Sequence, residues 1–137
     1  MSRNRWEQIR SKIHFNDNNL LVGCKDKLYK IRPFIDSIVE NFNKIPIREK
    51  ICVDKEMIPY KGYHSIKQYM KAKLKKWGYK VFVLCGSDDI VDNWELYTGA
   101  IDRDPDLPDG GVRGNVVLRL LKIVPPRNLY HKIYFDN

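Results

Sequence analysis

Ile51-Cys52-Val53-Asp54-Lys55-Glu56-Met57 is the run of residues from which the expected fold follows, and a similar run, Ile133-Tyr134-Phe135-Asp136-Asn137, ends the sequence. Both runs are short and rich in β-branched or aromatic residues, which predicts two strands that each deliver one aspartate near the end. Because side chains alternate along a strand, Asp54 and Asp136 each point away from the apolar residue before them. Two such strands lying side by side bring these two carboxylates together.

Paired carboxylates on neighbouring strand ends suit hard divalent cations such as Mg²⁺ or Mn²⁺. Two such ions can activate a water molecule and stabilise the leaving oxygen of a phosphodiester. An aspartate that closes a strand also serves as a turn former or helix cap, which is the commoner role, and spacing alone leaves both interpretations open for Asp54 and Asp136. Glu56 shares the strand face of Asp54 and is either a further metal ligand or an exposed strand-end side chain.

Length and composition set broad limits. The chain has 137 residues, which is the size of one ordinary domain. Its 25 Lys and Arg against 17 Asp and Glu give a net charge of +8, which favours a polyanionic partner. No apolar run reaches the length of a membrane span, so we expect a soluble intracellular protein with no membrane partner. Cys24, Cys52 and Cys85 lie in apolar surroundings, which predicts buried thiols with neither a disulfide framework nor a zinc pair.

Nearly the whole net charge lies in one segment, residues 61–80, which contains seven lysines, no acidic residue and several aromatic ones. Lysines contact phosphates without reading sequence, and exposed rings can stack on splayed bases. The segment is therefore either a DNA contact or a merely solvated surface, and Trp77 is either a core residue or a DNA contact. The lysines concerned are Lys61, Lys67, Lys71, Lys73, Lys75, Lys76 and Lys80.

The order of elements follows from periodicity and from the positions of proline and glycine. Two helices come first, one over residues 4–14 with Asn4 as its cap and one that begins near Pro33. Three strands in a meander and a crossover helix then lead to a final strand, which can lie parallel beside the first strand. The predicted bounds are strands at 51–58, 80–85 and 93–98, a helix at 112–124 and a strand at 131–136.

Several strings in the chain are specific in combination. QYM, KWG and ELYTG fall in order within Val53–Gly99, DKLYKIRPFID precedes them, and GNVVLRLL and YFDN follow. Together they resemble the catalytic domain of the piggyBac transposases and of the host genes derived from them. The resemblance implies a ribonuclease-H-like fold with an Asp-Asp-Asp metal site, in which Asp54 matches the first catalytic and metal-binding aspartate and Asp136 the second.

The resemblance also selects the topology that places Asp136 beside Asp54. It implies an α/β, partial ribonuclease-H-like fold, with a helical N-terminal region at 1–49 and the N-terminal part of the catalytic domain at 50–137. Mg²⁺ or Mn²⁺ as cofactor, DNA as partner and a nuclear location are implied in the same way. Where the family often has an acidic residue after the first aspartate, this chain has Lys55, whose charge opposes ion binding unless its side chain points away.

The family's third aspartate lies far downstream, whereas this sequence ends at Asn137. We therefore expect a transposase fragment that is inactive by itself, and whose last strand leaves an unpaired sheet edge open to self-association. A second hypothesis is a domesticated, non-catalytic DNA-binding module that works through Lys61 to Lys80. A third is a remnant without function.

Overall fold

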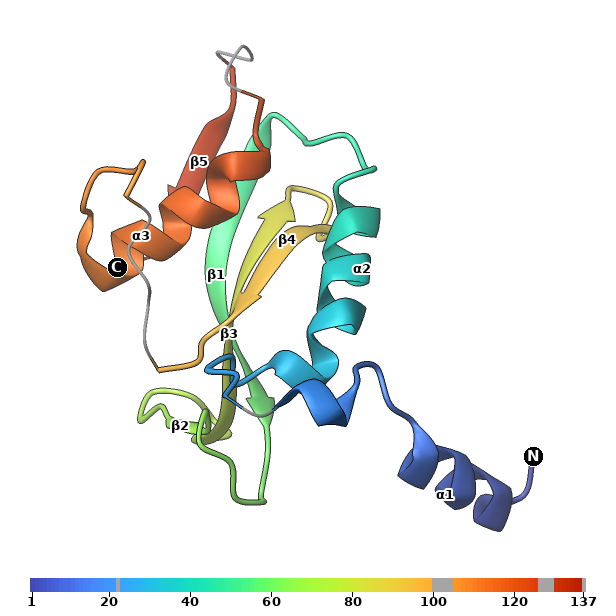
Figure 1. The fold of residues 1–137 in the computed structure, drawn as a ribbon. Coiled ribbons are helices and arrows are strands. Elements are labelled where there is room, and N and C mark those ends of the chain that lie inside the picture. Colours follow the sequence, from blue (N-terminus) through green and yellow to red (C-terminus); the bar gives the residue numbers. More distant parts are fainter. Residues whose placement is uncertain (22, 100–104, 126–129, 137) are drawn as a thin grey trace. The chain divides into compact units, whose positions relative to one another are not determined.

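The computed structural model describes residues 1–21, 23–99, 105–125 and 130–136 (Figure 1). The chain divides into two compact units, Met1–Ile38 and Val39–Asn137, and each is described by itself. Within the described ranges, no helix combines the length and the apolar composition needed to cross a bilayer.

The first unit begins with helix α1, Arg3–Lys12. Its cap is Ser2, which has extended backbone angles and accepts a hydrogen bond from the backbone N–H three residues later, at 3.3 Å. The predicted helix is therefore present, but the prediction of Asn4 as its cap is wrong, because Asn4 already lies within the first turn. The Glu7 carboxylate pairs with the Arg3 guanidinium at 3.0 Å.

Helix α2, Arg32–Phe42, begins in the first unit, and Pro33 occupies its first turn as predicted. An ion pair between Asp26 and Arg32 at 2.8 Å fixes the start of this helix. Ile35 is buried, whereas Phe34 is about half exposed and stacks on Phe15 with ring centroids 4.8 Å apart. Short 3-10 turns at Asn18–Leu21 and Tyr29–Ile31 join the two helices.

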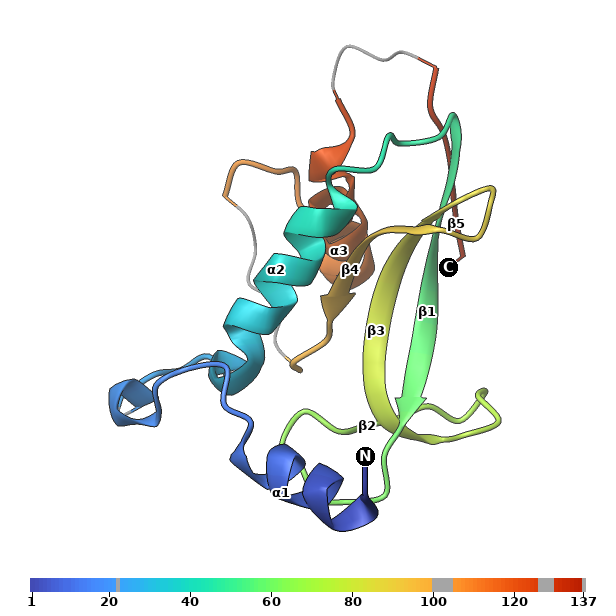
Figure 2. The ribbon, with the colours of Figure 1, turned by 90° about the vertical axis from the view of Figure 1, so that its right-hand side faces the viewer.

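The second unit is a curled mixed sheet organised around strand β1 (Figures 1 and 2). Strand β1 pairs antiparallel with β3 on one side and parallel with β5 on the other. Strands β4 and β2 both pair antiparallel with β3, so the sheet contains a meander and a parallel return strand. The strands are β1 Lys50–Pro59, β2 Gln68–Tyr69, β3 Trp77–Gly86, β4 Val91–Leu96 and β5 Lys132–Phe135.

Helix α3, Gly111–Leu120, lies between β4 and β5 in the chain and covers one face of the sheet (Figure 2). It continues as a 3-10 turn, Leu121–Ile123, before Pro125, so the predicted helix at 112–124 ends less regularly than expected. Arg119 Nε donates to Glu95 Oε2 at 3.0 Å and thereby attaches the helix to β4. The core between the helix and the sheet consists of Ile51, Val53, Phe82, Leu84, Val116 and Leu120.

One arginine connects the start of β1 to the hairpin of β3 and β4. The Arg48 guanidinium contacts Asp92 at 2.8 Å and Asp88 at 2.7 Å, and Asp92 is only 1% exposed. Nδ1 of His131, the residue before β5, lies 2.8 Å from the backbone carbonyl of Arg48. These contacts hold the beginnings of β1 and β5 next to each other.

Candidate functional site

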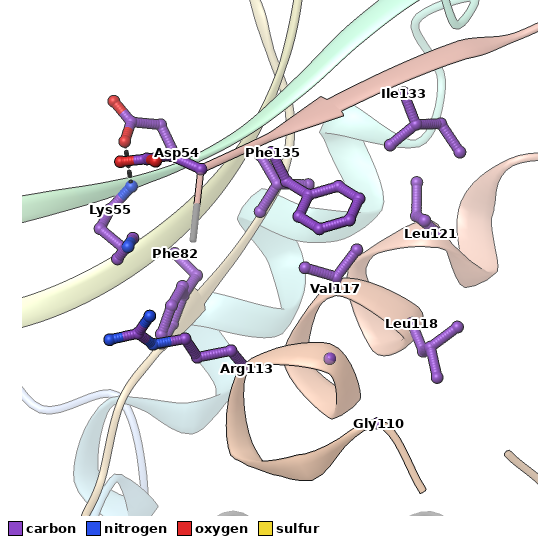
Figure 3. Close-up of a pocket in the computed structure, with 13 residues that line it drawn as sticks. Asp54, Lys55, Phe82, Gly110, Arg113, Val117, Leu118, Leu121, Ile133 and Phe135 are labelled. Atoms are coloured by element: carbon purple, nitrogen blue, oxygen red, sulfur yellow. Dashed lines mark hydrogen bonds between the residues drawn. The ribbon is translucent and has the colours of Figure 1, made fainter. Parts of the chain in front are cut away.

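Asp54 lies on the face of β1 that points away from α3. Side chains along β1 alternate between the two faces: Ile51 and Val53 are buried in the core below α3, whereas Cys52 and Asp54 are exposed on the opposite face. Asp54 Oδ1 accepts a hydrogen bond of 2.6 Å from the backbone N–H of Lys55, the dashed line in Figure 3. Its second carboxylate oxygen has no hydrogen bond to a described residue.

Asp136 follows directly after β5 and reaches the same region. The parallel register of β1 and β5 ends with Val53 opposite Phe135, and Asp54 and Asp136 are the residues that follow this last pair. The two aspartates therefore follow neighbouring strand positions, although more than half of the chain separates them. Both aspartates also line the same pocket.

That pocket lies between β5 and α3 and has a volume of about 490 Å³. In Figure 3, Ile133 and Phe135 point from β5 toward the apolar side chains of the helix and of the turn that follows it. The aspartates therefore stand beside an apolar hollow. The apolar residues that line it are Val53, Phe82, Val117, Leu118, Leu121, Ile133 and Phe135.

Lys55 lies on the other face of β1. It is the partner of Phe82 in the ladder, and Phe82 belongs to the core below α3, so strand alternation turns the lysine side chain away from Asp54. Burial lowers the pKa of nearby Lys80, and repulsion from Lys55 and Arg113 lowers it further. Arg113 of α3 lines the same pocket as Lys55. Its position near Lys55 and Lys80 depends on how α3 crosses the sheet, which the sequence pattern did not reveal.

The two aspartates fit part of a magnesium or manganese site. They supply carboxylate oxygens, the ligands that these ions prefer, from neighbouring strand ends. Among the residues that the structure describes, no cluster of three or more His, Cys, Asp or Glu side chains is arranged to hold a metal ion. Glu56 lies on the same face of β1 as Asp54, is exposed, and accepts the N–H of Met57 through Oε1 at 3.1 Å. Asp54 and Asp136 by themselves offer fewer ligands than such a site needs.

The predicted DNA-binding lysines lie in several environments. Lys67 Nζ donates to Gly62 O at 2.9 Å and lies 5.2 Å from the ring centroid of Trp77. Lys80 is half-buried on the α3 side of the sheet, 4.4 Å from the ring centroid of Phe82, and Lys73 is also half-buried. The lysines that are exposed are Lys61, Lys71, Lys75 and Lys76.

The same segment exposes aromatic rings. Trp77 is 55% exposed, so it is not a core residue, and its ring centroid lies 4.9 Å from that of Tyr69. Tyr63 is fully exposed. Trp77, Lys61, Lys75 and several neighbours line an open hollow of about 480 Å³. Charged groups and rings therefore lie together on one surface, while their contact with DNA stays a prediction.

The three cysteines are less buried than the sequence predicts. Cys24 and Cys52 are exposed and Cys85 is half-buried, so the prediction of three buried thiols is wrong. Apolar neighbours in the sequence do not bury a residue on the outer face of a sheet, because alternate strand positions face opposite sides. Cys52 and Cys85 are moreover direct partners in the ladder of β1 and β3.

Comparison with known proteins gives consistent results. A DDE family model described as Transposase IS4 matches residues 1–137. The human piggyBac transposable element-derived protein 2 is 33% identical over 98% of this chain, which spans 23% of that protein. The human piggyBac transposable element-derived protein 3 is 38% identical over 64% of this chain, which spans 14% of that protein.

A solved structure has the same fold. The cryo-EM structure of a piggyBac transposase synaptic complex with hairpin DNA superposes with a TM-score of 0.79 at 17% identity, covering 98% of this chain and 33% of that one. The chain thus corresponds to less than a quarter of its curated relatives and to a third of the solved transposase. On the whole-length family match and these relatives, the chain belongs to the piggyBac transposase family, within the group described as Transposase IS4.

Proposed function

We propose that this chain contributes the first two aspartates of a DDE-type site on a ribonuclease-H-like sheet, for metal-dependent cleavage and transfer of DNA strands. The observation that carries the proposal is the parallel pairing of β5 with β1, whose last pair, Val53 with Phe135, lies one residue before Asp54 and Asp136. The strand pairing, with three antiparallel strands and a crossover helix before β5, supports the ribonuclease-H-like assignment.

In this proposal Asp54 and Asp136 hold divalent ions through carboxylate oxygens. Such ions, when bound, activate an attacking oxygen and stabilise the leaving oxygen of a phosphodiester. The two paired strands position the aspartates, because Asp54 lies within β1 and Asp136 directly follows β5. Lys55 takes no part, because its side chain lies on the opposite face.

Manganese binding to the 137-residue chain tests the proposal. Two carboxylates alone give weak binding, with a Kd of about 1 mM or higher, which Mn²⁺ electron paramagnetic resonance can measure as loss of the free-ion signal. We expect Asp54→Asn and Asp136→Asn each to abolish binding. The matched control is Asp36→Asn, which removes an exposed carboxylate in the first unit. Equal binding by all four proteins refutes the site.

Cleavage needs more than these two ligands, so we expect no metal-dependent nicking of DNA by the 137-residue chain. The resemblance implies a third aspartate downstream. Adding a segment that carries it is expected to tighten Mn²⁺ binding and to produce cleavage that Asp54→Asn removes. Cleavage that survives Asp54→Asn contradicts the assignment of this aspartate.

A second candidate function is DNA binding without catalysis. It is favoured by the exposed lysines and rings of residues 61–77, and the synaptic DNA complex of the structural neighbour is consistent with it. It predicts duplex binding that weakens steeply with salt and that Asp54→Asn leaves unchanged. Loss of DNA binding on Asp54→Asn, with the lysines dispensable, contradicts this candidate.

Two further expectations accompany either function. Among the described strands β5 pairs with β1 alone, and all four of its residues are exposed, which favours self-association through strand pairing. Sedimentation velocity at increasing protein concentration tests it, and a chain that stays monomeric throughout refutes it. A nuclear location follows from a DNA partner and is tested by imaging a tagged chain.

A further inference from the structure

Two cysteines that are far apart in the sequence face each other across the sheet. Cys52 of β1 and Cys85 of β3 are partners in the antiparallel ladder, within a register that runs without interruption from Ile51 to Pro59. Partners in such a ladder project from the same face of the sheet. This is the face away from α3, because Val53 and Leu84, the next pair along, point into the core.

The Cα spacing of this pair lies within reach of a disulfide. Tyr60 N–H donates to Trp77 O at 3.2 Å, one step beyond the last pair of the ladder, so Tyr60 and Trp77 are a hydrogen-bonded pair. Hydrogen-bonded pairs recur at every second position, and Cys52 and Cys85 are therefore one of them. The Cα atoms of such a pair lie about 5.5 Å apart, within the range of about 4.4 to 6.8 Å that disulfides span. The Cβ atoms of a hydrogen-bonded pair lie near the upper end of about 4.5 to 5.5 Å, beyond the range of about 3.5 to 4.5 Å in a relaxed disulfide, so the strands must draw together locally and the bond that forms is readily reduced.

The two thiols differ in access. Cys52 is exposed, and Cys85 is half-buried between β1 and β4. Burial raises the pKa of Cys85, and the adjacent Cys52 raises it further. Exposure governs which thiol meets a reagent from solution. Cys52 is thus the thiol that reacts first, and Cys85 is the one placed to resolve the product.

We propose that Cys52 and Cys85 form a redox-modification site, which a small disulfide such as oxidised glutathione converts into a cross-strand disulfide. In the first step the Cys52 thiolate attacks the glutathione disulfide, forming a mixed disulfide and releasing one reduced glutathione. In the second step Cys85, as thiolate, attacks the Cys52 sulfur and releases the second glutathione. One disulfide is reduced and one is formed, and the two protons that leave the protein thiols are taken up, through solvent, by the two departing glutathione thiolates.

The cross-link joins β1 and β3 two residues before Asp54, on the same face of the sheet. It is expected to raise the melting temperature of the chain, because it constrains the unfolded state. The proposal does not depend on metal binding or DNA binding, since it uses only the ladder and the two thiols.

Intact mass spectrometry after treatment with oxidised glutathione, followed by alkylation, tests the proposal. The expected product is a monomer in which one disulfide has removed two hydrogens and a single cysteine is alkylated. The reduced chain, in contrast, carries three alkyl groups. Dithiothreitol added before alkylation should restore the reduced chain. Tryptic mapping of the wild-type chain should find the peptides of Cys52 and Cys85 linked. This measurement needs no variant that might fail to fold.

Three serine variants complete the test. Cys24→Ser removes the exposed thiol of the first unit and should leave the internal disulfide intact. Cys52→Ser and Cys85→Ser should each abolish it; the latter should stop at a glutathione adduct on Cys52. Separate glutathione adducts on Cys52 and Cys85 in the wild-type chain, or disulfides only between chains, overturn the proposal.

Discussion

Replacing the four exposed lysines of residues 61–76 by glutamine should remove most of the salt dependence of DNA binding. The structure limits the phosphate contacts to about four of the seven lysines, because Lys67 is held by Gly62 O, Lys80 lies against the ring of Phe82 and Lys73 is half-buried. Each neutralised phosphate contributes about −0.9 to the slope of log K against log salt, so four contribute about −3.6. The lysines replaced are Lys61, Lys71, Lys75 and Lys76.

That slope corresponds to a loss of affinity of about 150-fold between about 50 and 200 mM salt for the unsubstituted chain. Fluorescence anisotropy of a labelled duplex, titrated at several salt concentrations, measures it. The quadruple variant should bind more weakly at low salt and respond little to added salt.

The matched control carries four lysine-to-glutamine changes in the first unit, so it has the same net charge as the test variant. If the control flattens the salt response as much as the test variant does, binding follows net charge alone and the reasoning about residues 61–76 is refuted. The control residues are Lys12, Lys25, Lys27 and Lys30.

Three further predictions concern stability. Arg48→Met should lower the free energy of unfolding by about 3 to 5 kcal/mol in urea titration, because it leaves the buried Asp92 carboxylate without its partner. Gly78→Ala should cost about 1 to 3 kcal/mol in the same assay, because the added Cβ would lie 2.1 Å from the backbone oxygen of Ile58. The hydrogen bond from Arg32 lowers the pKa of Asp26, so Asp26 stabilises the fold fully above its unfolded pKa and progressively less as pH falls through the lower folded pKa. The melting temperature of Asp26→Asn should therefore lie below that of the wild type at neutral pH and approach it in acid.

Each of these changes has a control. Arg3→Met breaks an exposed pair and should cost less than about 1 kcal/mol. Gly114→Ala meets no atom within 4 Å and should stabilise α3 by about 0.4 to 1 kcal/mol. Asp36→Asn, at an exposed position, should show no such pH-dependent difference. A control that matches its test variant shows that the named contact is not the cause.

The regular elements were largely predictable from the sequence. The short run rich in β-branched residues predicts strand β1, and apolar residues at helical spacing predict α3. The strand boundaries were less predictable. Strand β3 begins at Trp77 and not at residue 80 as predicted. Gly78 weakens the strand pattern in the sequence, but in the structure its lack of a side chain lets β3 approach β1 closely. Strand β2 has two residues, too few for any periodicity.

Partnerships across the sheet could not be derived from periodicity. Alternation gives the face of Asp54 but not its neighbour, and the family resemblance was needed to choose β5 as the strand beside β1. The pairing of Cys52 with Cys85 depends on the register of two strands, which tertiary contacts fix and local sequence does not. The separation of Lys80 from the exposed lysines has the same origin, since it depends on which face of β3 the helix covers.

The pairing of β1 with β5 also has a kinetic consequence. The antiparallel strands β1, β3 and β4 are joined by shorter connections, whereas β5 returns to β1 only after more than half of the chain has intervened. Contacts with a large separation along the chain close costly loops and tend to form late in folding. We therefore expect refolding to produce the meander before β5 docks. An intermediate with an ordered sheet and separated aspartates should then precede the native chain, so the two carboxylates meet only in the last step.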